Sequence, residues 1–172
     1  MKRIVIAAGC FWGVEAYFKL LKGVVATKVG YVNGNIDKPK YEDLINKQAT
    51  HAEACEILYD ESVLTLETIL EHMFRIVDPT SINRQGNDIG LQYRTGIYYG
   101  ADEDRIIAES FVAVNQNKYK NKIAVEIKPE SGFYAAEDHH QDYLKKNPGG
   151  YCHVDLNLLR KDEKKQQVSF YN

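Results

Sequence analysis

A change of pattern at Gly9-Cys10 constrains the fold of this chain more than any other feature. Residues 3–8 form a short, apolar, partly β-branched run, which predicts a buried strand. Directly afterwards, apolar residues recur at helical spacing, at Phe11, Val14, Phe18 and Leu21. Gly23 suits the end of that helix. The sequence therefore predicts that Cys10 lies at a strand-to-helix turn.

Further along the chain, strand-like and helix-like segments alternate irregularly. Strands are expected at residues 24–31, 51–59, 95–99 and 123–127, and helices at residues 41–47, 66–77, 102–119 and 137–144. Asn33-Gly34 predicts a hairpin or tight turn. Residues 78–94 form a long loop of the kind that is often functional. This order favours an α+β fold over a doubly wound parallel sheet: a two-layer α/β sandwich with a mixed, largely antiparallel central sheet and an irregular C-terminal segment.

The length of 172 residues predicts a single domain at residues 1–160 and a charged C-terminal tail at residues 161–172. The charged run at residues 160–165 is expected to be solvated. A formal net charge of -2 provides no positive field for nucleic acid or an anionic membrane. No apolar run approaches the roughly 20 residues of a membrane span, and 3 Cys are too few for a disulfide scaffold. We expect a cytoplasmic protein in a reducing compartment, and a monomer.

Cys10 is the residue best suited to carry chemistry. The orphan amides of a helix N-terminus carry partial positive charge and stabilise a thiolate. We therefore expect the pKa of Cys10 to lie below the usual value of about 8.5 unless burial opposes this effect. Phe11 and Trp12 follow directly and would wall an apolar substrate group. The alternative is an inert buried cysteine that behaves as a small hydrophobic residue.

Glu53 is a carboxyl on an otherwise apolar strand. Burial raises the pKa of such a group and makes it a general acid near neutral pH. The alternative is a structural carboxylate that is hydrogen-bonded or lies at a sheet edge. His51, two residues away on the same strand face, either orients a partner or fills space. Cys55, next on that face, fits the core.

Cys152 lies in residues 149–153. The glycines of this segment predict that it is mobile. A flexible cysteine near a nucleophilic one is a resolving thiol. Zinc binding by Cys152 and His153 with His139 and His140 is the alternative. Adjacent histidines are expected to project in different directions, and no C-x-x-C spacing is present, so we expect no metal. No glycine-rich nucleotide loop is present either, so no cofactor is expected.

Several sequence blocks stand out together. They are Gly9-Cys10-Phe11-Trp12-Gly13-Val14-Glu15; His51-Ala52-Glu53; Asn83-Arg84-Gln85-Gly86-Asn87-Asp88 with Gln92-Tyr93-Arg94; and Glu137-Asp138 through His140-Gln141 to Gly150-Tyr151-Cys152-His153. These blocks resemble the A-type peptide methionine sulfoxide reductases, and the first heptapeptide is specific to that family. The similarity spans about residues 3–160. Thr50, Asn33 and Leu91 depart from the family's usual residues. These departures concern the detailed structure of loops and not the residues that would carry the chemistry.

The resemblance implies a role for each matching residue. The catalytic residues would be Cys10 (nucleophile), Glu53 (acid), Tyr41 and Tyr93 (hydrogen bonds to the sulfoxide oxygen), Asp88 (support of the site) and Cys152 (recycling thiol). The substrate-binding residues would be Phe11 and Trp12, as walls around the sulfoxide methyl group, and Tyr151.

The resemblance also implies the reaction: thiol-dependent reduction of methionine-S-sulfoxide, free or in proteins, and hence repair of oxidised proteins. Methionine would be released and Cys10 would become a sulfenic acid, which Cys152 would resolve to a disulfide. Thioredoxin is the expected reductant and partner. Attack on a sulfoxide requires its oxygen to be protonated or hydrogen-bonded, which Glu53 and two tyrosine hydroxyls would supply.

Two other functions fit parts of the same pattern. A Cys–His hydrolase or acyltransferase would use Cys10 with His51 or His140, and it would need an oxyanion hole instead of an acid. A non-catalytic module that binds methionine sulfoxide peptides would use the same aromatic residues.

Overall fold

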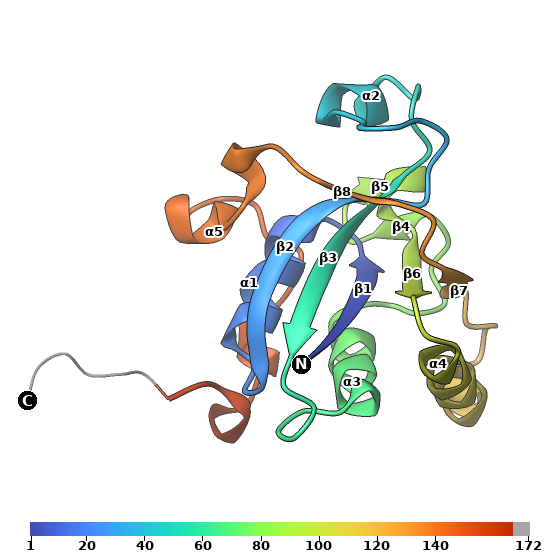
Figure 1. Ribbon diagram of the computed structural model, residues 1–172, viewed down its shortest axis with the longest axis vertical. Helices are drawn as coiled ribbons and strands as arrows, with labels where there is room; N and C mark the ends of the chain where they lie inside the picture. The colour runs from blue at the N-terminus through green and yellow to red at the C-terminus, as the bar shows by residue number, and fades with distance from the viewer. Residues whose placement is uncertain (167–172) are drawn as a thin grey trace, which may run out of the picture.

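The computed structural model describes residues 1–166, which fold around a mixed six-stranded sheet (Figure 1). Its strands, in order across the sheet, are β7 (Glu126–Pro129), β6 (Thr95–Tyr99), β1 (Lys2–Ala8), β3 (Ala52–Tyr59), β2 (Val24–Val32) and β8 (Phe133–Ala135). All neighbours are antiparallel except β6 and β7, which are parallel. The strand that leads to Cys10, β1, is therefore paired on both sides. Residues 167–172 of the expected tail lie outside the described residues.

The helices are α1 (Phe11–Leu20), α2 (Tyr41–Ile45), α3 (Leu66–Ile76), α4 (Asp102–Asn115) and α5 (Tyr143–Lys146). Helices α1 and α4 contact the strands, whereas α2 lies beyond one end of the sheet (Figure 1). Helix α1 packs on β2 and β3, and α3, which packs beside α4, adds to the same core. This is the α+β fold with a mixed, largely antiparallel sheet that the sequence predicts. Within residues 1–166 no helix is long and apolar enough to cross a membrane.

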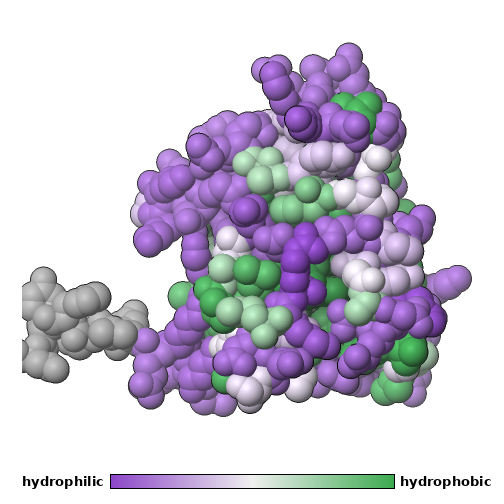
Figure 2. Space-filling view, in the orientation of Figure 1, coloured by the Kyte–Doolittle hydropathy of each residue, from purple (hydrophilic) through white to green (hydrophobic). Residues whose placement is uncertain are grey.

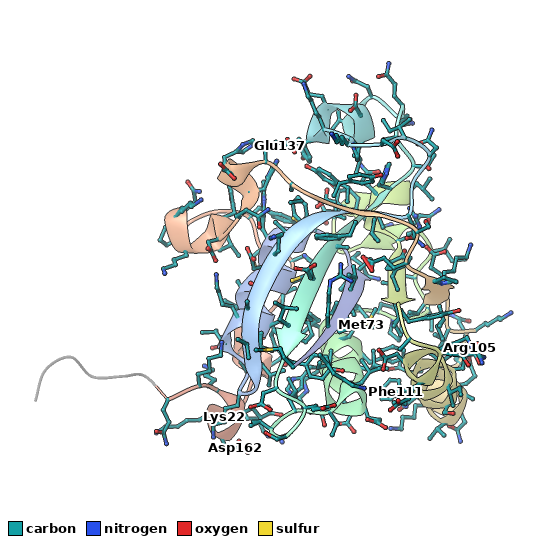
Figure 3. All side chains as sticks on the ribbon, viewed as in Figure 1. Lys22, Met73, Arg105, Phe111, Glu137 and Asp162 are labelled. Carbon is teal, nitrogen blue, oxygen red and sulfur yellow. The ribbon has the colours of Figure 1, made fainter. Side chains whose placement is uncertain are left out.

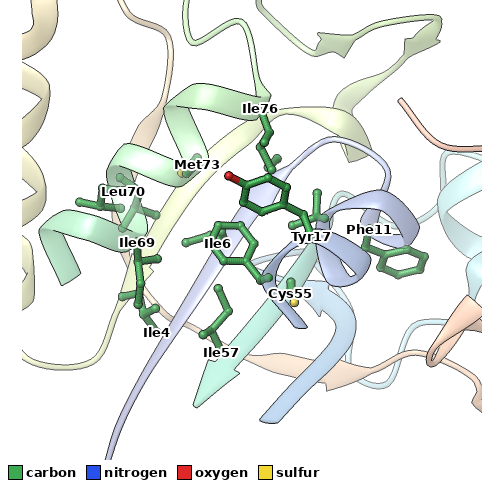
Figure 4. Packing of buried hydrophobic residues seen from close by; sticks show 14 of the residues in the cluster. Ile4, Ile6, Phe11, Tyr17, Cys55, Ile57, Ile69, Leu70, Met73 and Ile76 are labelled. Carbon is green, nitrogen blue, oxygen red and sulfur yellow. The ribbon is translucent and has the colours of Figure 1, made fainter. Parts of the chain in front are cut away.

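The period-two pattern of β3 divides the buried residues between the two faces of the sheet. Cys55 and Ile57 belong to the main core, together with Met73 of α3 (Figure 4). The alternate residues Ala52 and Ala54 belong to a smaller cluster on the other face. On the face seen in Figure 2, hydrophobic residues gather near the centre, over the strands, and hydrophilic residues surround them.

Three segments differ from the structure that the sequence predicts. The strand expected at residues 123–127 lies at Glu126–Pro129. Asn33 has the positive φ of a tight turn (53°), but a long connection containing α2, not a hairpin, joins β2 to β3. The expected helix at residues 137–144 is broken. Gln141 bonds through its side chain to both backbone groups of Val29, and Asp142 turns into the left-handed region (φ 54°). These bonds replace the backbone bonds of a continuous helix.

The loop at residues 78–94 has a fixed shape. It contains a small antiparallel pair, β4 (Arg84–Gln85) and β5 (Asp88–Ile89), and a 3-10 turn at Leu91–Tyr93. Asp88 and Tyr93 are therefore held by regular structure at the same end of the sheet as α2 (Figure 1).

Most of residues 160–165 are exposed, as expected of a solvated charged run, but Glu163 is half-buried and packs against the domain. Glu163 accepts hydrogen bonds from Arg75 of α3 at 2.7 and 3.2 Å. Its backbone carbonyl also accepts the N–H of Lys22 at 2.9 Å. Figure 3 shows Lys22 and Asp162 at this contact. The charged run thus contacts the end of α1 through its backbone and α3 through the paired Glu163 carboxylate.

We expect Glu163→Gln to lower the free energy of unfolding by about 2 kcal/mol at pH 7. The hydrogen-bonded Arg75 guanidinium lowers the pKa of Glu163 from 4.5 to about 2. Its contribution is therefore fully present above the unfolded-state pKa and is lost as the pH falls through the folded-state pKa. Urea unfolding measured from pH 7 down to pH 3 should show the difference between wild type and variant narrowing to about half.

Asp162→Asn is the matched control, because the Asp162 side chain is 77% exposed. It should change the free energy of unfolding by less than about 0.5 kcal/mol. Equal losses in the two variants would mean that the Arg75–Glu163 pair does not stabilise the fold.

Candidate active site

Cys10 lies where the sequence predicts, at the N-cap of α1 directly after β1. Gly9 makes the turn with a φ of 87°, and a Cβ at that position would lie 2.8 Å from the Gln85 side chain. Both the backbone conformation and the close approach require glycine. Cys10 is 7% exposed and its thiol is free. The turn therefore fixes a buried thiol at the end of the sheet.

Burial raises the pKa of Cys10 well above its ordinary value, and the Glu53 carboxyl raises it further. The backbone N–H of Trp12 acts in the opposite direction, as expected at a helix N-terminus, but it is outweighed. Burial therefore opposes the helix N-terminus, which is the exception stated with the expected lowered pKa, because exclusion of water disfavours the thiolate more than the helix amides favour it. The resting nucleophile is a protonated thiol.

Glu53, near the start of β3, lies against the first turn of α1. Its Oε1 accepts the backbone N–H of Phe11 at 3.3 Å, and the residue is 2% exposed. Burial raises the pKa of Glu53 to about 8, the Phe11 hydrogen bond opposes this shift, and Asp88 adds to it. A carboxyl with this pKa carries a proton at neutral pH. Glu53 is therefore able to donate a proton beside Cys10.

Tyr41, Tyr93 and Asp88 gather around these two groups. Burial raises the pKa of both tyrosine hydroxyls, and the charges of Glu53, Cys10 and Asp88 raise it further. No lysine or arginine is among the residues that shift these pKa values. The site thus favours the protonated forms of the Cys10 thiol, the Glu53 carboxyl and the two tyrosine hydroxyls. In these forms the groups donate hydrogen bonds, which suits a neutral ligand that carries an oxygen.

The two aromatic residues after Cys10 have different surroundings. Phe11 is 1% exposed and packs against His140, with 5.4 Å between ring centroids, so it belongs to the core as well as to the site. Trp12 is partly buried and stacks on Tyr143 of α5, with 3.7 Å between centroids. Its Nε1–H donates to Nδ1 of His140 at 3.1 Å. His140 and Tyr143 thus hold the Trp12 ring as a wall.

Glu137 positions α2. The sequence pointed to it only as part of a block that resembles the reductase family. Its Oε1 accepts the Tyr31 hydroxyl at 2.9 Å, and its Oε2 accepts the Tyr41 N–H at 3.4 Å. Tyr143 carried no sequence signal, because it reaches Trp12 only after the left-handed turn at Asp142. Both are positioning residues for the site.

Cys152 is half-buried beside the first turn of α1. A Cβ at Gly13 would lie 2.9 Å from the Cys152 Sγ, so glycine is what allows this sulfur to approach the helix. Cys152 also contributes to the raised pKa of Cys10, which places the two thiols in one environment. Tyr151 is 41% exposed, and burial and the nearby Asp88 raise the pKa of its hydroxyl. Both residues of the C-terminal segment therefore meet the site.

His51 and Cys55 lie outside the site. The His51 ring packs against Gly34 and Tyr134, and Cys55 is fully buried in the main core (Figure 4). Within the part of the chain that the structure describes, no hydrogen bond joins Cys10 to a histidine. The Cys–His pair of a hydrolase is therefore missing.

A buried thiol with a carboxyl acid at its side, and no histidine hydrogen-bonded to it among the described residues, fits the class of thiol oxidoreductases. Comparison with known proteins narrows this class. The family model of peptide methionine sulfoxide reductase matches residues 2–170, and the chain belongs to this family. The family resemblance and the enzyme class that the sequence predicts are confirmed.

Relatives and solved structures agree with this assignment. Peptide methionine sulfoxide reductase MsrA of Alkaliphilus metalliredigens is 54% identical over 158 residues, which cover 92% of this chain and 100% of that protein. Mxr1 from Saccharomyces cerevisiae in reduced form is similar in structure, with a TM-score of 0.84 and 41% identity over 88% of both chains. Mxr1 in complex with Trx2 has a TM-score of 0.59 and 33% identity, over 83% of this chain and 84% of that one.

Proposed function

We propose that this enzyme reduces methionine-S-sulfoxide, free or in proteins, to methionine, with thioredoxin as reductant, and so repairs oxidised proteins. The protonated Glu53 carboxyl beside the buried Cys10 thiol carries the proposal, because sulfoxide reduction needs an acid and a nucleophile in one place. The relatives named MsrA and the complex of Mxr1 with thioredoxin Trx2 support it.

In the first half-reaction, the sulfoxide oxygen faces Glu53, Tyr41 and Tyr93, and the Cys10 sulfur attacks the sulfoxide sulfur. The S–O bond of the substrate breaks, the oxygen ends on Cys10 as a sulfenic acid, and methionine leaves. Thiol plus sulfoxide gives sulfenic acid plus thioether, so no net proton is consumed. Glu53 lends its proton to the oxygen and recovers the one that Cys10 gives up. This cycle explains how a thiol with a raised pKa serves as the nucleophile.

In the second half-reaction, the Cys152 thiol attacks the sulfenic sulfur of Cys10, and a disulfide forms with loss of water. A thioredoxin dithiol then reduces this disulfide by exchange and becomes a disulfide itself. The space left by Gly13 supports the assignment of Cys152, because it lets that sulfur approach the helix that begins beside Cys10.

Selection of one sulfoxide epimer follows because one side of the pocket is apolar and the other side carries hydrogen-bond donors. Trp12 and Phe11 form an apolar wall for the methyl group, and Tyr151 contacts the rest of the substrate. The donors Glu53 and Tyr41 lie on the oxygen's side. Exchanging methyl and oxygen would place a polar group against the wall and leave the donors unpaired, which disfavours the other epimer. We further propose that the enzyme acts as a cytoplasmic monomer.

Reduction of each methionine sulfoxide epimer, first with dithiothreitol and then with thioredoxin, tests the function. We expect the S epimer to be converted to methionine with either reductant and the R epimer to remain. Equal conversion of both epimers would contradict the proposed pocket. Turnover of an ester without any reductant would instead favour the hydrolase.

A further inference from the structure

Glu137, His139 and His140 form a compact cluster beside the site, where Glu137 is labelled in Figure 3. One ligand-type atom from each residue lies within 4.8 Å of the others. The 3-10 turn at Asp138–His140 brings the two imidazole rings together, with 4.1 Å between their centroids. The expectation that these adjacent histidines project in different directions is therefore wrong.

The ring of His140 provides an independent observation. Its Nδ1 accepts the Trp12 Nε1–H at 3.1 Å, so the neutral ring carries its proton on Nε2. The residue is 2% exposed, and within residues 1–166 Nε2 has no hydrogen-bond partner. Glu137 Oε2 lies 3.9 Å from this nitrogen, which is too far for a hydrogen bond. A buried ring nitrogen thus points at a carboxylate with a gap between them.

We propose that Glu137, His139 and His140 bind a divalent cation of the zinc type. Two imidazole nitrogens and a carboxylate oxygen are ligands that Zn²⁺ accepts at about 2.0–2.2 Å, whereas magnesium and calcium take oxygen ligands. A tetrahedral ion would bring the ligand atoms to about 3.3 Å from one another. His139 is exposed, so rotation of its side chain is free to close the cluster.

Cation binding is coupled to Trp12. When Nε2 of His140 binds a metal ion, the proton of the neutral ring lies on Nδ1. Nδ1–H then faces the Nε1–H of Trp12, and two donors cannot bond to each other. Trp12 therefore loses its hydrogen bond to His140, one of the two contacts that hold it as a wall, and zinc should inhibit the reductase. The inhibition rests on the proposed function, whereas the binding does not.

Fluorescence of Trp12, the 1 Trp of the chain, tests the binding. Zinc is titrated into the double variant Cys10→Ser and Cys152→Ser, in which neither of these thiols competes for the ion. We expect a saturable change of emission with zinc and none with magnesium or calcium. Adding His139→Gln should weaken zinc binding at least about tenfold, whereas Asp138→Asn, a neighbouring carboxylate outside the cluster, should leave it within about threefold. No change of emission, or equal affinity with His139→Gln, overturns the site.

Single-turnover release of methionine, without any added thiol that would bind zinc, tests the inhibition. Without zinc, His139→Gln should react like the wild type, because His139 touches neither substrate nor Cys10. With zinc, this variant should need at least about tenfold more of the ion for the same inhibition. Equal sensitivity would assign the inhibition to the thiols and overturn the coupling through Trp12.

Discussion

Replacing Glu53 with Gln should lower the rate of sulfoxide reduction by about 10²–10⁴-fold, the usual contribution of a general acid. The amide keeps the size of the side chain and can still accept the Phe11 N–H, but it cannot give up a proton. Substrate binding should change little. Single-turnover release of methionine measures the chemical step. Glu53→Ala should lose more, because it also removes the hydrogen-bond donor and leaves a cavity.

The pH profile of the single-turnover rate provides a second readout. Because burial raises the pKa of Glu53 to about 8, the wild-type rate should decline as the pH rises through about 8. That decline should be absent from Glu53→Gln. Ionisation of Cys10 increases with pH and acts in the opposite direction, so alkylation of Cys10 must be measured in the same variants.

Glu15→Gln is the matched control for this prediction. Glu15 is also a buried carboxyl, 3% exposed, whose pKa is raised mainly by burial. It bonds to Thr27 and to the backbone of Asp142, away from Cys10. Its variant should reduce sulfoxide within about threefold of wild type, far from the effect of losing a general acid. If Glu53→Gln also does so, another donor supplies the proton and the role of Glu53 is wrong.

The variant Cys152→Ser should release about one equivalent of methionine per enzyme and then stop when thioredoxin is the only reductant. The first half-reaction needs Cys10 alone, so its rate should be near that of wild type. The sulfenic acid then has no thiol to condense with, and thioredoxin has no disulfide to reduce. Methionine counted over time with thioredoxin, its reductase and NADPH measures both phases.

Cys55→Ala is the control, because Cys55 is fully buried in the core. It should keep thioredoxin-driven turnover. Mass mapping of the wild type after reaction should show Cys10 joined to Cys152 and Cys55 free. A Cys10–Cys55 bridge, or continued turnover of Cys152→Ser, would assign recycling to a different thiol.

Elements with a clear period were predictable from the sequence. The strand before Cys10, the helix after it and the alternation of β3 all follow from residues that lie close together in the chain. By contrast, β8 has only 3 residues and exists because it pairs with β2 at the sheet edge, which no local pattern reports. The docking of Glu163 likewise depends on Arg75, which lies 88 residues away.

Some residues of the site were predictable from local sequence patterns, and others only from the family resemblance. The positions of Cys10 and Glu53 follow from the strand and helix patterns, whereas Tyr41, Tyr93, Asp88 and Cys152 were assigned only through the family resemblance. The pKa of Cys10 could not be foreseen, because it depends on how much water the complete fold excludes. The contacts that hold Trp12 come from His140 and Tyr143, which the broken helix brings back onto α1.

The order of the strands also determines when this enzyme can finish folding. Helix α1 and β1 are synthesised first, but β1 pairs with β3 and β6, and the end of α1 contacts residues 160–165. Pairings so distant in the chain are slow to form, and they cannot be completed on the ribosome until the last segment has emerged. The groups around Cys10 come from β3, from the loop at residues 78–94 and from the segment around Cys152. The burial of the thiol is therefore complete only after the segment around Cys152 has been synthesised and has joined the site.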